Sequence, residues 1–390
     1  TNNASGNSTT ISGGLSNTAS GNGSSVSGGY ENTASGGASS IGGGASNYAT
    51  YSGSTVGGGY GNQSSGGSST ISGGQGNTAS GAYFPTIGGG QSNVASANGT
   101  TVSGGSSNNA SYVNSTIAGG ISNTASGGNS TVSGGGGNDA TGSNATIGGG
   151  SNNEATGTNN STVGGGSLNN VSGENSTIGG GTGNISDYAD STIGGGNTNK
   201  ASGYNYGKST VGGGYGNTAS ADYSTVSGGT GNTASGNESS TIGGGNTNNA
   251  SGNGTTISGG ANNIASGNGS SVSGGYSNTA SGGASSIGGG TTNQATYGGS
   301  TVGGGYGNQS NSGGTTVSGG ITNTASGNTS SIGGGSGNTA SGGNSTISGG
   351  ATNQATYSGS TVGGGYGNTA SGGSSSIGGG VGNQASANNT

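Results

Sequence analysis

The side chains that could do chemistry in this chain are few. It contains no histidine and no cysteine, so a nucleophile would have to be Ser or Thr beside Lys200 or Lys208, or two carboxylates would have to act together. Asp187 and Asp190 stand close together in "ISDYADS" and could offer oxygen ligands to calcium at a corner of the chain. Because oxygen ligands are scarce around them, we interpret both as solvated charges. We therefore expect no enzyme activity, no catalytic or cofactor-binding residue, no metal site and no cofactor.

Glycine-rich stretches such as "GGGYG" superficially suggest a phosphate-binding loop. "YGKST" at residues 206–210 lacks the upstream glycine spacing of such a loop, so we interpret these stretches as structural corners. Two lysines stand against eight carboxylates, with a net charge of −6, which predicts no nucleic-acid partner. The apolar runs are short, so this segment is not expected to insert into a membrane.

A second group of candidate residues is aromatic. Exposed tyrosines directly after a Gly-Gly pair could stack on glycans or pack against a partner chain, or they could cover the thin corner of their own repeat. The candidate surface-contact residues are Tyr30, Tyr60, Tyr215, Tyr276, Tyr306 and Tyr366. Sequons for N-glycosylation also occur, among them Asn7, Asn114, Asn144 and Asn175, although this composition generates such matches by itself.

The elements that position these side chains follow from a repeat. Glycine makes up 109 of 390 residues, and charged residues only 3%, which would fit low-complexity disorder if residue order were ignored. Taking as position 0 an Ile or Val that precedes a small residue and Gly-Gly, we find 25 copies at a spacing of 15 residues. Three single-residue insertions and one of three residues interrupt the spacing, before Ile87, Val163, Ile242 and, for the longest, Val211. Self-similarity at a fixed period is typical of a solenoid.

Side-chain alternation predicts which positions point inward. Every copy has Ser or Thr at −1, Gly at +2 and +3, and Asn at +6, and 21 copies have Ala at +8. Two short strands would place −2, 0, +6 and +8 inside and −1, +7 and +9 outside, with charge only where solvent reaches it. We expect apolar and amide ladders along the stack, beginning with Ile11, Val26, Ile41, Asn17, Asn32 and Asn47. The glycine pair would supply positive φ or close approach at a tight corner.

The predicted fold is all-β, a parallel β-solenoid of about 25 coils with a 15-residue repeat, and residues 1–390 form a single continuous array. Coils 1–9 resemble coils 17–25, since "TISGGLSNTASGNGSSVSGGY" at 10–30 returns as "TISGGANNIASGNGSSVSGGY" at 256–276. The middle, residues 139–238, is more divergent and holds most of the charged residues. Each coil buries little apolar surface for its length, so we expect self-association to bury more.

The repeat resembles the YadA-like (Hep/Hag) repeats in the heads of trimeric autotransporter adhesins. The likeness rests on "STVGGGYGNTASG" and "TISGGLSNTASG", in which Ile or Val follows Ser or Thr and precedes the Gly pair, and Ala is followed by Ser or Thr. It covers essentially the whole chain and implies a left-handed β-roll, association of three chains and binding to host matrix or other surfaces. The chain departs from the family in its slightly longer unit and in showing no neck motif, coiled-coil heptads or membrane anchor.

We therefore expect an extracellular or cell-surface protein, a surface fibre or adhesin head whose Thr-, Ser-, Tyr- and Asn-rich faces serve attachment. Its expected partners are further copies of itself, as a homotrimer or filament, and host matrix, a glycan or another cell surface. A purely structural extracellular filament subunit is the alternative. Ice binding ranks behind both, because the Ser/Thr column at −1 lacks the second row of a Thr-x-Thr face.

Overall fold

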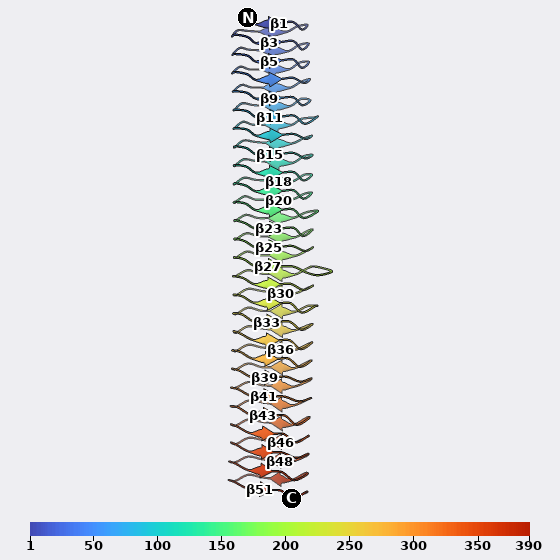
Figure 1. The fold of residues 1–390 in the computed structure, drawn as a ribbon, viewed down its shortest axis with the longest axis vertical. Coiled ribbons are helices and arrows are strands. Elements are labelled where there is room, and N and C mark those ends of the chain that lie inside the picture. Colours follow the sequence, from blue (N-terminus) through green and yellow to red (C-terminus); the bar gives the residue numbers. More distant parts are fainter. The chain divides into compact units, whose positions relative to one another are not determined.

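The computed structural model describes residues 1–390, which form only short strands and turns. All 51 strands are two residues long, and no helix is present that could cross a membrane. The chain divides into two compact units, Thr1–Gly196 (unit 1) and Asn197–Thr390 (unit 2). In each unit the coils stack one on the next (Figure 1). The predicted all-β parallel solenoid with a repeat of about 15 residues is confirmed.

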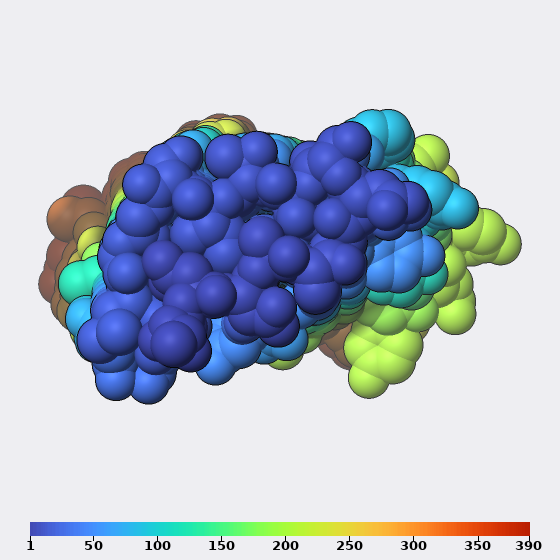
Figure 2. Space-filling model, turned by 90° about the horizontal axis from the view of Figure 1, so that it is seen from above, coloured from blue at the N-terminus to red at the C-terminus, as the bar shows by residue number.

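In unit 1, each coil adds one strand to each of two parallel sheets. Strand β1 (Asn3–Ala4) pairs with β3 (Thr18–Ala19), and β2 (Thr10–Ile11) pairs with β4 (Ser25–Val26). The register joins equivalent positions of successive repeats, which is the stacking that the 15-residue spacing predicts. Viewed from its N-terminal end, the first coils are wider than they are deep (Figure 2).

Unit 2 is built in the same way. Strand β27 (Lys200–Ala201) pairs with β29 (Thr218–Ala219), and β28 (Thr210–Val211) pairs with β30 (Thr225–Val226). The pairing continues in parallel to β51 (Gln384–Ala385). Each coil of unit 2 therefore also adds one strand to each of two parallel sheets.

The core is one side chain deep. Position 0 of one sheet and +8 of the other are fully buried in the inner coils, as are −2 and +6, so the predicted facing is confirmed. Where Ser replaces Ala at +8 it finds a polar partner inside: Ser64 Oγ lies 2.6 Å from Ser69 Oγ, and Ser310 Oγ lies 2.6 Å from Thr315 Oγ1. The thin core therefore tolerates a hydroxyl at +8, since position −2 supplies the hydrogen bond.

The two glycines of the pair have different tasks. Gly320, at +3, has a φ of 94°, and a Cβ there would lie 2.1 Å from the carbonyl oxygen of Gly335 in the next coil. At +2, a Cβ on Gly319 would meet nothing closer than 3.9 Å. Close approach of stacked backbones therefore explains the +3 glycine, whereas space does not explain the +2 glycine.

A third ladder that the sequence did not reveal runs through +4. Single parallel bridges join Leu15 to Tyr30 and Tyr30 to Ala45 in unit 1, and Tyr276 to Thr291 in unit 2. Main-chain pairing thus continues into the Gly-Gly corner, which makes this corner as regular as the strands.

Candidate functional site

The two edges of each coil differ. The edge formed by +2 to +5, here named the constant edge, has the same length in every repeat. The opposite edge, between the +8 strand and the following −1 strand, is named the loop edge. All four insertions lie there, before Ile87, Val163, Ile242 and Val211. Sequence variation that changes the backbone is therefore confined to one edge.

The asparagines at +6 form a continuous column of buried amides within each unit. Asn32 Nδ2–H donates to the carbonyls of Gly28 and Gly44 at 3.0 and 2.9 Å, and its backbone N–H donates to Asn17 Oδ1 at 3.0 Å. Asn47 binds Asn32 in the same way. Each amide therefore ties its own coil to the coil before it and the coil after it.

The apolar candidates lie directly in register. Ile11 is beside Val26, and Val26 is beside Ile41. Val26 and Ile41 are fully buried, whereas Ile11 in the first coil is half-buried. Val26 and Ile41 therefore belong to the scaffold and are not accessible to a ligand, whereas Ile11 keeps part of its surface exposed.

The six candidate tyrosines at +4 are all exposed, by 45% to 59%. They lie on the constant edge and share their column with other exposed apolar side chains, including Leu15, Ile121, Ile321 and Val381. A hydrogen bond to the Glu31 carboxylate, together with its negative charge, raises the pKa of the Tyr30 phenol. Sequence reasoning found the tyrosines but did not place the aliphatic residues in the same stripe.

The longest insertion creates a hollow on the loop edge of unit 2. Tyr204, Asn205 and Tyr206 connect β27 to β28 and project from the stack (Figure 1). Together with side chains of the next two coils they line a hollow of about 720 Å³. Its lining is aromatic and polar, with Tyr223, Glu238, Asn237 and several serines beside the loop.

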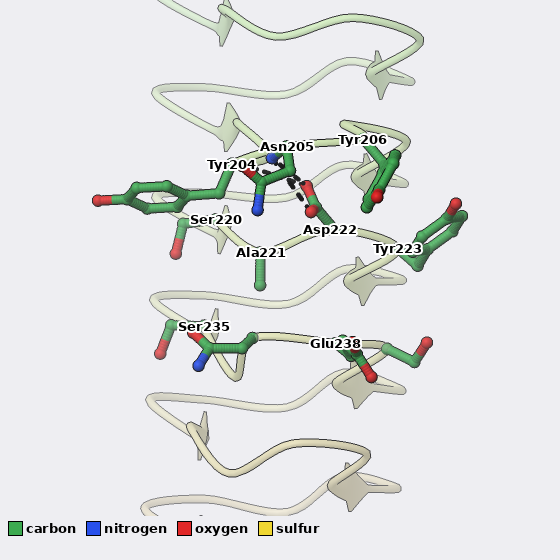
Figure 3. A pocket seen from close by; sticks show the side chains of 11 residues that line it. Tyr204, Asn205, Tyr206, Ser220, Ala221, Asp222, Tyr223, Ser235 and Glu238 are labelled. Carbon is green, nitrogen blue, oxygen red and sulfur yellow. Dashed lines mark hydrogen bonds between the residues drawn. The ribbon is translucent and has the colours of Figure 1, made fainter.

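Asp222 holds this loop from below. Its Oδ1 accepts backbone hydrogen bonds from Tyr204 at 2.7 Å and Asn205 at 3.1 Å (Figure 3). It also accepts one from the Gly207 N–H at 3.0 Å. The side chain is 5% exposed, so the expectation that charge sits only where solvent reaches it is wrong here. Burial opposes ionisation of Asp222, but the backbone N–H groups outweigh it and hold its pKa below the ordinary value of 3.8. The carboxylate is therefore ionised at neutral pH and positions the loop.

The rings around the hollow are well exposed. Tyr204 and Tyr206 are 79% and 68% exposed and point to opposite sides of the loop, Tyr206 on the side of Tyr223 (Figure 3). Lys208 Nζ lies 5.5 Å from the ring centroid of Tyr223, a cation–π contact. Ser235 lies on the same side as Tyr204 (Figure 3). The loop thus offers two aromatic surfaces with polar groups beside them.

The remaining charged candidates do not converge on a metal site. Asp187 is half-buried and Asp190 exposed, and no group of three or more carboxylate, histidine or cysteine side chains comes together. Asp139 lies opposite Glu154 in the register at +7. Burial and the charge of Glu154 raise the pKa of Asp139. The sequon residues Asn7, Asn114, Asn144 and Asn175 are exposed on the loop edge.

Comparison with known proteins adds no relative. No protein-family model matches the chain, and no curated protein matches its sequence.

Proposed function

We propose that the chain is an extracellular surface fibre or adhesin head whose two edges make different contacts. The observation that carries the proposal is the division within the coil: the interior repeats with little change and the constant edge keeps one backbone length, whereas insertions and the projecting tyrosine loop lie on the loop edge. A rigid scaffold with variable exposed loops is the arrangement that binding proteins commonly use. The loop edge is therefore the proposed attachment surface.

The constant edge is the proposed contact between copies of the chain. Its +4 column carries exposed apolar side chains at intervals in each unit, separated by polar and small residues such as Gln75, Ser106 and Thr230. Exposed apolar groups that gather on one edge can mark an interaction site. They are Leu15, Tyr30, Tyr60 and Ile121 in unit 1, and Tyr215, Tyr276, Tyr306, Ile321, Tyr366 and Val381 in unit 2. A second copy is the partner that matches them best, since it carries the same side chains at the same coil spacing of about 4.8 Å.

The proposal is tested with beads that carry the full chain, applied to extracellular-matrix coatings and to intact cells. Retention of the beads above that of beads coated with an unrelated protein is expected. Electron cryo-microscopy of the same preparation counts the chains in cross-section, and three chains or a filament is expected. End-to-end polymers without any retention would favour the purely structural filament, and thermal hysteresis without retention would favour ice binding.

A further inference from the structure

We propose that the hollow beneath Tyr204, Asn205 and Tyr206 binds a neutral oligosaccharide. This inference rests on the proposed attachment function and names the ligand class for one place on the loop edge. The hollow, about 720 Å³, has room for a few sugar rings. Only here does the repeat gain three residues at once.

The loop cannot recognise a ligand through most of its backbone donors. The N–H groups of Tyr204, Asn205 and Gly207 are already bound to Asp222. Recognition therefore falls to side chains, which here are phenols, hydroxyls, two amides and one exposed carboxylate. A peptide that adds to a sheet needs free backbone groups, so this loop is poorly suited to bind one in that way.

The side chains that remain match the chemistry of a sugar. A pyranose ring has C–H faces that pack on aromatic rings and hydroxyl groups that both donate and accept hydrogen bonds. Tyr204 and Tyr206 provide exposed rings held on a fixed loop, while Ser235, Asn237 and Glu238 provide hydrogen-bonding groups. Tyrosine with serine and asparagine is also the combination that antibody binding loops use for varied ligands, since tyrosine gives large contact area at low entropy cost.

Charge selects among sugars. Asp222 and Glu238 line the hollow, and the cation of Lys208 lies 5.5 Å from the ring of Tyr223, which also lines it. Two carboxylates thus stand against one ammonium group, and the net charge around the hollow is negative. A sialylated or sulfated glycan would meet like charge there. A neutral oligosaccharide has no such penalty.

The test uses the full chain against immobilised neutral, sialylated and sulfated oligosaccharides and against a set of peptides, followed by titration calorimetry with the neutral sugar bound best. The main variant deletes residues 204–206 and replaces Asp222→Asn, so that "SGYNYGKST" becomes "SGGKST", the pattern of "SGGNST" at 341–346. A second variant, Tyr204→Ala with Tyr206→Ala, keeps the loop length. Tyr297→Ala is the matched control, since this tyrosine lies on the loop edge of the same unit and is 62% exposed.

Binding of neutral sugars is expected, with Kd raised roughly tenfold or more in both loop variants, since each variant loses the two aromatic rings that would pack on the sugar. Tyr297→Ala should leave Kd within about twofold. Circular dichroism of each variant confirms that it is folded. Absence of sugar binding, preference for acidic glycans or for a peptide, or full binding by a folded deletion variant would overturn the inference. If chain-coated beads still adhere in that case, the proposed function stands without this ligand; if they adhere to nothing, the proposed function itself fails.

Discussion

Removing one amide from the buried asparagine column should destabilise unit 2 strongly. Asn248 Nδ2–H donates to the carbonyls of Gly244 and Gly260 at 3.0 and 2.9 Å, and its Oδ1 accepts from the Asn263 N–H at 3.0 Å. In Asn248→Ala the Gly260 carbonyl keeps the bond from the Asn246 N–H, but the Asn263 N–H and the Gly244 carbonyl lose their partner. Each buried unsatisfied group costs about 1–3 kcal/mol. Since Gly244 is only half-buried, we expect a total loss of about 2–4 kcal/mol.

The next residue supplies the control. Asn249 lies at +7 with its side chain exposed, so Asn249→Ala removes the same atoms from the surface and should cost less than about 0.5 kcal/mol. Urea denaturation followed by circular dichroism measures both variants, and amide exchange shows whether protection falls at Asn263. Equal losses in the two variants, or a loss below about 1 kcal/mol for Asn248→Ala, would refute the assignment of the column as the main polar tie between coils.

Gly320→Ala should lower the unfolding free energy by more than about 2 kcal/mol, because the added Cβ meets the carbonyl of the next coil and the φ of Gly320 is 94°. Gly319→Ala should lower it by less than about 1 kcal/mol. Chemical denaturation of the two variants measures this difference. Asp139→Asn should stabilise unit 1 by roughly 0.5 kcal/mol at neutral pH, because it removes a half-buried charge that also lies opposite the like charge of Glu154. The pKa of Asp139 is raised in the folded chain, so its charged form destabilises at neutral pH and this gain should vanish in denaturation curves below the ordinary value of 3.8. The pKa of Asp222 is lowered, so its hydrogen bonds to the loop should be fully formed above pH 3.8 and lost only as the pH falls below that value. Limited proteolysis of the loop is compared at neutral pH and at about pH 2. The absence of any difference would show that the carboxylate does not hold the loop.

The interior could be predicted from the sequence because it depends on residue type at fixed spacing. An Ile or Val at position 0, such as Val26 and Ile41, and an Asn at +6 recur in every coil. Side-chain alternation alone places them inside. The tyrosines after Gly-Gly could be identified in the same way. The partner that these tyrosines contact could not be predicted, since the sequence of one chain does not show what binds to it.

Features that depend on the backbone could not be predicted from the sequence. The third ladder passes through Leu15, Ala45 and Gly136 alike, because main-chain hydrogen bonds do not depend on the side chain. Gly319 and Gly320 are equally constant in the repeat, yet only at Gly320 does a stacked carbonyl exclude a side chain. The sequence shows a glycine at both positions, but it does not show which atom of the next coil lies beside each one.

Only part of the hollow could be predicted from the sequence. The insertion around Tyr204 is evident as a break in the 15-residue spacing. The role of Asp222 is not evident from the sequence, because this residue lies 15 residues beyond Gly207 and contacts the loop only because successive coils stack. One signal could have found it: an acidic residue one repeat after an insertion, at a corner position that is usually Gly, Asn or Ser.

The most direct test of the central claim compares adhesion of the full chain with that of a chain whose loop edge has been smoothed. The smoothed variant lacks residues 204–206, carries Asp222→Asn, and has Ser in place of Tyr51, Tyr83 and Phe84, which are exposed on the same edge of unit 1. Bead retention on cells and matrix coatings is measured for both, with folding checked by circular dichroism. Strong retention of the full chain and its loss in the folded, smoothed chain is the predicted result; equal retention of the two, or none for either, would contradict the assignment of attachment to the loop edge.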